Sequence, residues 1–148
     1  MTGQTAKIES RCDGCGGTLV RQVNQFIDCG QLWWDAEASC ATCGDGWCEH
    51  PEAGRPPEAV RSALLAAHGP SRLRAVGPVP NLVPVLRVLR EVWEMPLSQA
   101  RELADELAHA GLAGTLTEME FLHTRLRSRG VAAEVTSDAG PEGERIPS

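Results

Sequence analysis

The sequence predicts an α+β protein in two parts: an N-terminal β module, joined by one helix to a small domain with the element order β-α-α-β-α-β. Three observations indicate this. All six cysteines fall within residues 12–48, among short runs rich in β-branched and aromatic residues. Residues 51–57 then carry three prolines and a glycine, which suit a connector. From residue 71 onward, apolar residues recur at strand and helical spacings.

The cysteines of the first part form two Cys-x-x-Cys knuckles, Cys12 with Cys15 and Cys40 with Cys43. A two-residue spacer lets both thiolates of a knuckle converge on one ion, and two knuckles complete a tetrahedral four-sulfur site. Glycines follow each knuckle and supply the positive-φ positions that turn backbone amides toward the sulfurs. They are Gly14, Gly16, Gly17, Gly44 and Gly46. Residues 12–54 therefore resemble a zinc ribbon, and zinc is the expected cofactor.

Other uses of the cysteines are weaker. A secreted disulfide framework is disfavoured because residues 1–10 contain no apolar signal region. A thioredoxin-like redox pair needs a single Cys-x-x-Cys in a βαβ unit, whereas this sequence has two. Cys29, Cys48 and His50 are also available, and Cys48 or His50 in place of a knuckle thiolate stays an open alternative. The favoured interpretation is that Cys29 and Cys48 are small buried apolar residues.

Strand-like runs lie between and after the knuckles. Residues 1–11 are expected to be a flexible polar arm. Residues 18–25 and 31–36 are predicted strands joined by a turn at Asp28-Cys29-Gly30, and residues 46–50 suit a third short strand. Trp33 and Trp34 must point to opposite faces of their strand. We expect one of them to be exposed as an interface anchor, with cover by the following helix as the equal alternative.

The charge distribution disfavours nucleic-acid binding, which is a common role of zinc ribbons. The net charge of the chain is −6, and Arg21 is the only lysine or arginine in residues 12–54, against seven acidic residues. Nucleic-acid binding needs a basic surface, so it is disfavoured. A protein partner, such as a basic toxin or enzyme, fits better. The candidate contacts on this module are Trp33, Trp34, Asp35 and Glu37.

Residues 55–70 are predicted to be a linker with a helix over residues 58–68. Its narrow apolar face, Val60, Leu64 and Ala67, suits packing between the two parts. Residues 71–136 then form the second domain, and residues 137–148 are expected to be a disordered tail. The predicted elements are a strand at 72–76, helices at 81–93 and 97–110, a strand at 111–116, a helix at 117–129 that opens with a Thr117–Glu120 capping box, and a strand at 131–135.

This second domain resembles the C-terminal domain of the bacterial ribosomal stalk protein, which recruits translational GTPases. The resemblance rests on Val-Pro-Val-Leu-Arg-Val-Leu-Arg-Glu-Val (83–92), Leu-Ser-Gln-Ala-Arg-Glu-Leu (97–103) and Leu-Arg-Ser-Arg-Gly-Val-Ala-Ala-Glu-Val (126–135). It implies a basic factor-binding face formed by Arg87, Arg90 and Arg101. Pro96 stands where the family usually has glycine, and Ser98 where it often has lysine.

No catalytic constellation is visible, because the four histidines are dispersed and no phosphate-binding glycine loop occurs. No apolar run approaches the ~18–20 residues that span a bilayer. We therefore expect a non-enzymatic, cytoplasmic bacterial protein that binds another protein. The leading interpretation is an inhibitor or immunity-type protein acting through the acidic zinc module. The alternative is a translation-associated adaptor using the arginine face towards a ribosomal or GTPase partner, and a thiol enzyme is the third.

Overall fold

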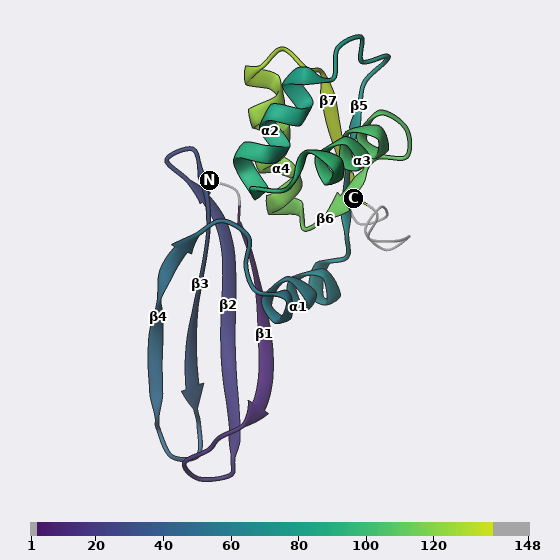
Figure 1. The fold of residues 1–148 in the computed structure, drawn as a ribbon. Coiled ribbons are helices and arrows are strands. Elements are labelled where there is room, and N and C mark those ends of the chain that lie inside the picture. Colours follow the sequence, from purple (N-terminus) through teal and green to yellow (C-terminus); the bar gives the residue numbers. More distant parts are fainter. Residues whose placement is uncertain (1–2, 138–148) are drawn as a thin grey trace. The chain divides into compact units, whose positions relative to one another are not determined.

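The structure, a computed structural model, describes residues 3–137 and divides into two compact units, with the boundary between Ala67 and His68 (Figure 1). The first unit holds four strands and one helix, and the second holds three strands and three helices. Both units combine helices with antiparallel sheets, so the predicted α+β class is confirmed.

The first unit is built on a four-stranded antiparallel sheet in the order β1-β2-β3-β4. Its strands are β1 (Gly3–Arg11), β2 (Thr18–Asp28), β3 (Gln31–Cys40) and β4 (Gly46–Ala53). The predicted turn between β2 and β3 is present: Asp28 pairs with Gln31, and both intervening residues have positive φ, 52° at Cys29 and 72° at Gly30. Two positive φ values in a two-residue loop match the twist of the flanking strands.

The helix α1 (Glu58–His68) has the predicted bounds but not the predicted role. Val60 and Leu64 are fully buried in one cluster with Val23, Trp34 and Ala36 of the sheet. These two helix residues are four apart and so lie on the same side of the helix. The helix is therefore the second layer of the first unit and not a linker, and it covers one face of the sheet (Figure 1).

The prediction of a flexible arm over residues 1–11 is wrong, because Gly3–Arg11 forms the edge strand β1. All nine of its residues pair with β2, from Gly3 with Phe26 to Arg11 with Thr18. Ala6 is buried in the core and Ile8 packs against it, whereas the side chains between and beside them are exposed. Only two apolar residues of the strand reach the core, so its composition is that of a polar arm. Buried and exposed side chains nevertheless alternate along it, as they do in a strand.

The second unit has the predicted order of strand, helix, helix, strand, helix and strand. Its elements are β5 (Ser71–Ala75), α2 (Val83–Trp93), α3 (Leu97–Ala108), β6 (Leu112–Gly114), α4 (Leu116–Ser128) and β7 (Ala133–Ser137). In the sheet, β5 lies between β6 and β7 and is antiparallel to both. The three helices and β5 bury a common core that includes Leu73, Leu89, Leu107 and Leu122. Ser137 ends β7, and the rest of the predicted tail lies outside the described residues.

The capping box of α4 lies two residues before the predicted one. Thr115, and not Thr117, is the N-cap: its Oγ1 accepts from the Glu118 backbone N–H at 3.1 Å, and Glu118 Oε1 accepts from the Thr115 N–H at 3.2 Å. Thr115 and Glu118 are buried. The earlier start places Met119 and Leu122 in the core.

Removing this box should destabilise the second unit. We expect Thr115→Ala and Glu118→Ala each to lower the free energy of unfolding by about 1–2 kcal/mol, because each leaves a helix amide without its acceptor. Glu120→Ala, at the position the sequence favoured, should change it by less than about 0.5 kcal/mol. Urea unfolding followed through amide signals of α4 measures all three. Equal losses at Glu118 and Glu120 would contradict the observed cap.

Candidate metal centre

The two knuckles meet at one end of the first sheet. Cys12 and Cys15 lie in the loop between β1 and β2, and Cys40 and Cys43 lie at the end of β3 and in the loop to β4. In an antiparallel meander these two loops share the same end of the sheet, the lower end in Figure 1. The strand order therefore brings the two knuckles close together in space, although they are far apart in the sequence.

The four sulfurs are positioned to bind one metal ion. All four Sγ atoms lie within 4.8 Å of one another. Cys12 Sγ is 3.8 Å from Cys43 Sγ, and Cys15 Sγ is 3.5 Å from Cys40 Sγ. A tetrahedron with metal–sulfur bonds of about 2.3 Å has edges of about 3.8 Å, so the observed spacing fits four-sulfur coordination. The thiols are free, with Cys12 and Cys40 buried and Cys15 and Cys43 exposed.

The two loops repeat the same backbone pattern. The Gly16 N–H donates to Cys12 O at 2.8 Å, and the Gly44 N–H donates to Cys40 O at 2.8 Å. Both glycines have positive φ, 78° and 81°, as expected from the sequence, whereas the same expectation is wrong for Gly14, Gly17 and Gly46. In addition, the Gly17 N–H donates to Cys15 Sγ at 3.3 Å. Amide donors of this kind stabilise a thiolate and fix the direction of its lone pairs.

The knuckles also interlock through residues that do not bind metal. A Cβ on Gly17 would lie 2.6 Å from Thr42 Oγ1, 2.9 Å from Thr42 Cβ and 3.3 Å from Cys15 Sγ. A Cβ on Gly14 would lie 3.1 Å from Asp45 Oδ2 and 3.8 Å from Cys12 Sγ. Glycine at position 17 is therefore required by close approach of the second knuckle, and not by backbone conformation.

The electrostatics of the cluster favour a cation. The backbone N–H of Cys43 is the main cause that lowers the pKa of Cys40 to about 6, with help from the Cys15 thiol. For Cys43, the amide of Asp45 favours the thiolate, but burial and the neighbouring thiols together raise the pKa of Cys43 to about 12. The Cys40 thiol therefore loses its proton more readily than the Cys43 thiol, whose ionisation the neighbouring thiols penalise. A bound dication removes this penalty.

The remaining candidate ligands lie outside the cluster. Within residues 3–137, the metal-binding group contains the four knuckle cysteines alone, without Cys29, Cys48 or His50. The expectation that Cys29 and Cys48 are small buried residues is wrong, because both are exposed. Cys29 is in the β2–β3 turn and Cys48 is on the edge strand β4, where no second layer covers them.

Neither tryptophan of the expected interface pair, Trp33 and Trp34, is the most exposed tryptophan of the first unit. Trp34 is only 8% exposed and packs under α1, so it cannot act as a surface anchor. Trp33 is half-buried, and its Nε1–H donates to Asp28 O at 3.2 Å. The exposed tryptophan is Trp47, at 49%. The sequence analysis did not identify Trp47 as the exposed tryptophan, although its place beside Gly46 in the last strand of a meander was the available signal.

The other predicted contact residues are on two separate surfaces. Asp35 is half-buried and accepts from Asn24 Nδ2 at 2.7 Å, while Glu37 is exposed. In the second unit, the exposed Arg87 and Arg90 line one cavity of about 500 Å³ together with Glu91 and Glu94. Arg101 is exposed on α3 but does not line that cavity.

No protein-family model, curated protein or solved structure matches this chain. Within residues 3–137, no helix is both long enough and apolar enough to cross a membrane. Function is therefore inferred from the geometry and charge of the two units themselves.

Loss of one knuckle thiol should remove the metal. We expect Cys40→Ser to abolish the single metal equivalent and to unfold the first unit, because metal binding and folding are coupled in a core this small. Cys48→Ser is the matched control, since it removes an exposed cysteine of the same unit and should keep the full equivalent. Elemental analysis and amide NMR spectra measure the two effects. A Cys40→Ser chain that keeps its metal would contradict the assignment.

The contact between the knuckles predicts a rescue. Gly17→Ala should weaken metal binding roughly ten- to a hundredfold, because overpacking a close contact costs about 1–3 kcal/mol. Thr42→Gly removes the atoms that the new methyl group meets, so the double variant should regain most of the affinity relative to Thr42→Gly alone. Competition titration with a chelator measures each variant. Equal losses from Gly17→Ala in both backgrounds would show that the two side chains do not interact.

Proposed function

We propose that this chain is a non-enzymatic zinc-binding protein whose acidic first unit binds a basic protein partner, as an inhibitor or immunity-type protein does. The observation that carries the proposal is the combination of a four-sulfur centre with an acidic hairpin. Residues 31–54, which form β3, β4 and their flanks, contain five acidic residues and no lysine or arginine. These acidic residues are Asp35, Glu37, Asp45, Glu49 and Glu52.

Zinc is the metal that this donor set fits best. Four thiolates at tetrahedral spacing select zinc or an iron–sulfur centre over magnesium, calcium or manganese. Four protein sulfurs also fill a tetrahedral zinc, which leaves no open position for water or substrate. Zinc would then be structural, and the bound metal with four thiolates would carry a further net charge of about −2. Both consequences support a binding role over catalysis.

Charge gives this surface its selectivity. Acidic side chains clustered around a protein interface speed the encounter with a basic partner and repel phosphate backbones. Arg21, the only basic residue in residues 12–54, is already held by Glu49 in a two-pronged ion pair of 2.8 Å and 2.9 Å. Arg21 therefore neutralises Glu49 and leaves the other four acids of the hairpin, Asp35, Glu37, Asp45 and Glu52, without a basic residue of this module to offset them.

A second candidate function depends on the second unit. Arg87 and Arg90 are exposed side chains that line the same cavity, at positions that match the factor-binding face of the ribosomal stalk domain. This arrangement supports a translation-associated adaptor. The same surface also carries Glu91 and Glu94, which lower its net positive charge. For that reason it is the second candidate and not the first.

Charge changes on each surface separate the two functions. We expect Asp35→Asn with Glu37→Lys to slow association with a partner captured from the native host at least about fivefold at low salt, because charged residues steer encounter. Asparagine at 35 keeps an acceptor for Asn24. The matched control, Glu106→Gln with Glu102→Lys, makes the same charge change on exposed positions of α3. Association rates at low and high salt are measured by surface-based binding kinetics.

Arg87→Glu with Arg90→Glu completes this comparison. Under the first function it should leave the association rate within about twofold, whereas under the second it should abolish binding. An acidic-pair variant that associates as fast as the unmodified protein at every salt concentration would reject the first function. Circular dichroism must show that each variant is folded before the rates are compared.

A further inference from the structure

The outer edge of β4 is one of the two open edges of the first sheet. β4 is the terminal strand in the order β1-β2-β3-β4, and Gly46, Trp47 and Cys48 are all exposed. The other half of the strand is protected: Pro51 lacks a backbone donor, and the pairing with β3 shifts between Trp34 and Ala36. Residues 46–49 therefore offer unpaired backbone groups that nothing on this strand blocks.

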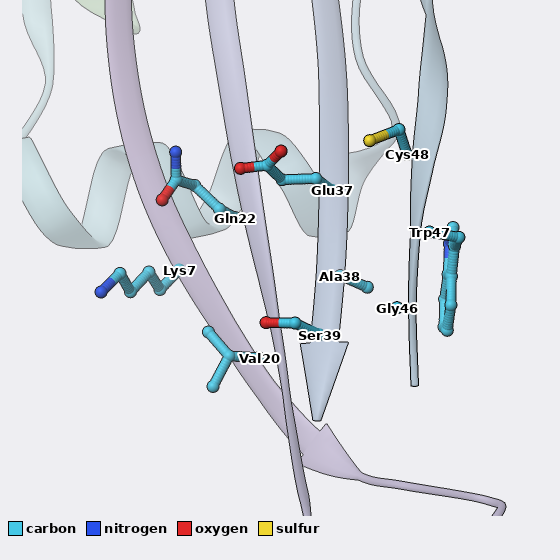
Figure 2. A pocket seen from close by; sticks show the side chains of 9 residues that line it. All are labelled: Lys7, Val20, Gln22, Glu37, Ala38, Ser39, Gly46, Trp47 and Cys48. Carbon is cyan, nitrogen blue, oxygen red and sulfur yellow. The ribbon is translucent and has the colours of Figure 1, made fainter. Parts of the chain in front are cut away.

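A hollow lies next to this edge, on the face of the sheet turned away from α1. Its volume is about 510 Å³, and Figure 2 shows Glu37 and Cys48 beside it, with Gln22 and Lys7 across the sheet. A smaller hollow of about 150 Å³ shares Glu37 and Cys48 with it and adds Asp35. The larger hollow is lined by one acid, Glu37 of β3, and by one cation, Lys7 of the far strand β1, whereas the smaller hollow beside it is lined by Asp35, Glu37 and Glu49 and by no cation.

Trp47 lies at the same edge. It stands beside β4 in Figure 2 and is 49% exposed. A hydrogen bond from Trp47 contributes to lowering the pKa of Glu49, after the larger contribution of Arg21. Arg21 in turn donates a hydrogen bond to each carboxylate oxygen of Glu49. Exposed tryptophan side chains are frequent interface anchors.

We propose that residues 46–49 of β4 bind an extended, arginine- or lysine-bearing segment of the partner protein by strand addition. Main-chain hydrogen bonds to the open edge supply affinity, and alternate side chains supply specificity. One set of partner side chains packs on Trp47, and the other set, which is basic, enters the hollow towards Glu37. The inference rests on the proposed function, because it names the place where the acidic unit holds its basic partner.

A second copy of this chain fits the same edge poorly. Pairing β4 with β4 would bring two strands that contain Glu49 and Glu52, flanked by Asp45, next to each other. Like charges across neighbouring strands are destabilising. A basic strand avoids this repulsion, so charge complementarity selects a partner of opposite sign.

Two peptides of opposite charge test the edge directly. The probe is a capped peptide, Thr-Arg-Val-Arg-Val-Arg-Thr, and its matched control replaces the three arginines with glutamates. Each is titrated into the full-length, metal-loaded protein labelled with ¹⁵N. We expect the basic peptide to shift the amide signals of Gly46, Trp47, Cys48 and Glu49, and the acidic peptide to leave them unchanged.

Backbone pairing and the two side-chain contacts are tested separately. Two basic peptides are methylated on alternate backbone nitrogens, one at the odd positions and the other at the even positions. One of the two should lose at least about tenfold in affinity, because its methyl groups replace the N–H groups that would donate to the edge. Trp47→Ala should weaken the basic peptide about tenfold, and Leu97→Ala, an exposed apolar residue of the second unit, less than twofold. Glu37→Gln should weaken it about threefold at low salt and not at high salt.

The outcomes separate this inference from the proposed function. Signal changes in residues 3–67 that avoid β4, or full affinity for both methylated peptides, would overturn strand addition but leave an acidic unit that binds basic protein. The absence of any change in residues 3–67, or equal binding of the basic and acidic peptides, would overturn both. The methylated peptides need no protein variant, so the test holds even if Trp47→Ala fails to fold.

Discussion

The meeting of four sulfurs at one end of the first sheet is the contact on which the first unit depends. The two closest sulfur pairs, Cys12 with Cys43 and Cys15 with Cys40, both join one knuckle to the other. A metal ion there ties the β1–β2 hairpin to the β3–β4 hairpin. The buried cluster between sheet and helix is small, because three of its six members are alanine or valine residues of the sheet. A core of this size gains much of its stability from a bound metal.

The position of this centre decides where the first unit can meet a partner. The knuckles occupy the loop end of the sheet and α1 covers one face, which leaves the other face and the edges of β1 and β4. Edge strands are usually protected by charge, proline or irregular pairing. β1 carries charged Lys7, and the second half of β4 has Pro51, whereas residues 46–49 present Trp47, Cys48 and one acid, Glu49. Glu49 opposes an acidic strand at this edge but not a basic one.

Sequence reasoning succeeded where the signal was local. Cys-x-x-Cys spacing, the Asp28-Cys29-Gly30 turn and the periodicity of α2 each depend on neighbouring residues, and the structure has all three. It failed where the choice depends on distant contacts. Period two places Trp33 and Trp34 on opposite faces, but only the docking of Val60 and Leu64 decides which face is covered.

The capping box of α4 shows the same limit on a smaller scale. The sequence contains two overlapping Thr-x-x-Glu patterns, one starting at Thr115 and the other at Thr117. Both satisfy the local requirement for a cap. The start at Thr115 is selected by packing, because it brings Met119 and Leu122 onto the core of the second unit. No window of a few residues contains that information.

The charges of the two units also indicate which unit would attract a basic protein more strongly. The cavity at Arg87 and Arg90 also includes Glu91 and Glu94, so charges of both signs are mixed there. Glu91 moreover pairs with Arg129 at 2.7 Å, an exposed ion pair that contributes little to stability. Surfaces of mixed charge steer weakly, whereas the β3–β4 hairpin stays net negative even after Arg21 of β2 pairs with Glu49, and its field extends over about a Debye length, roughly 8 Å in physiological salt. Long-range attraction therefore favours the first unit as the surface that a basic protein reaches first.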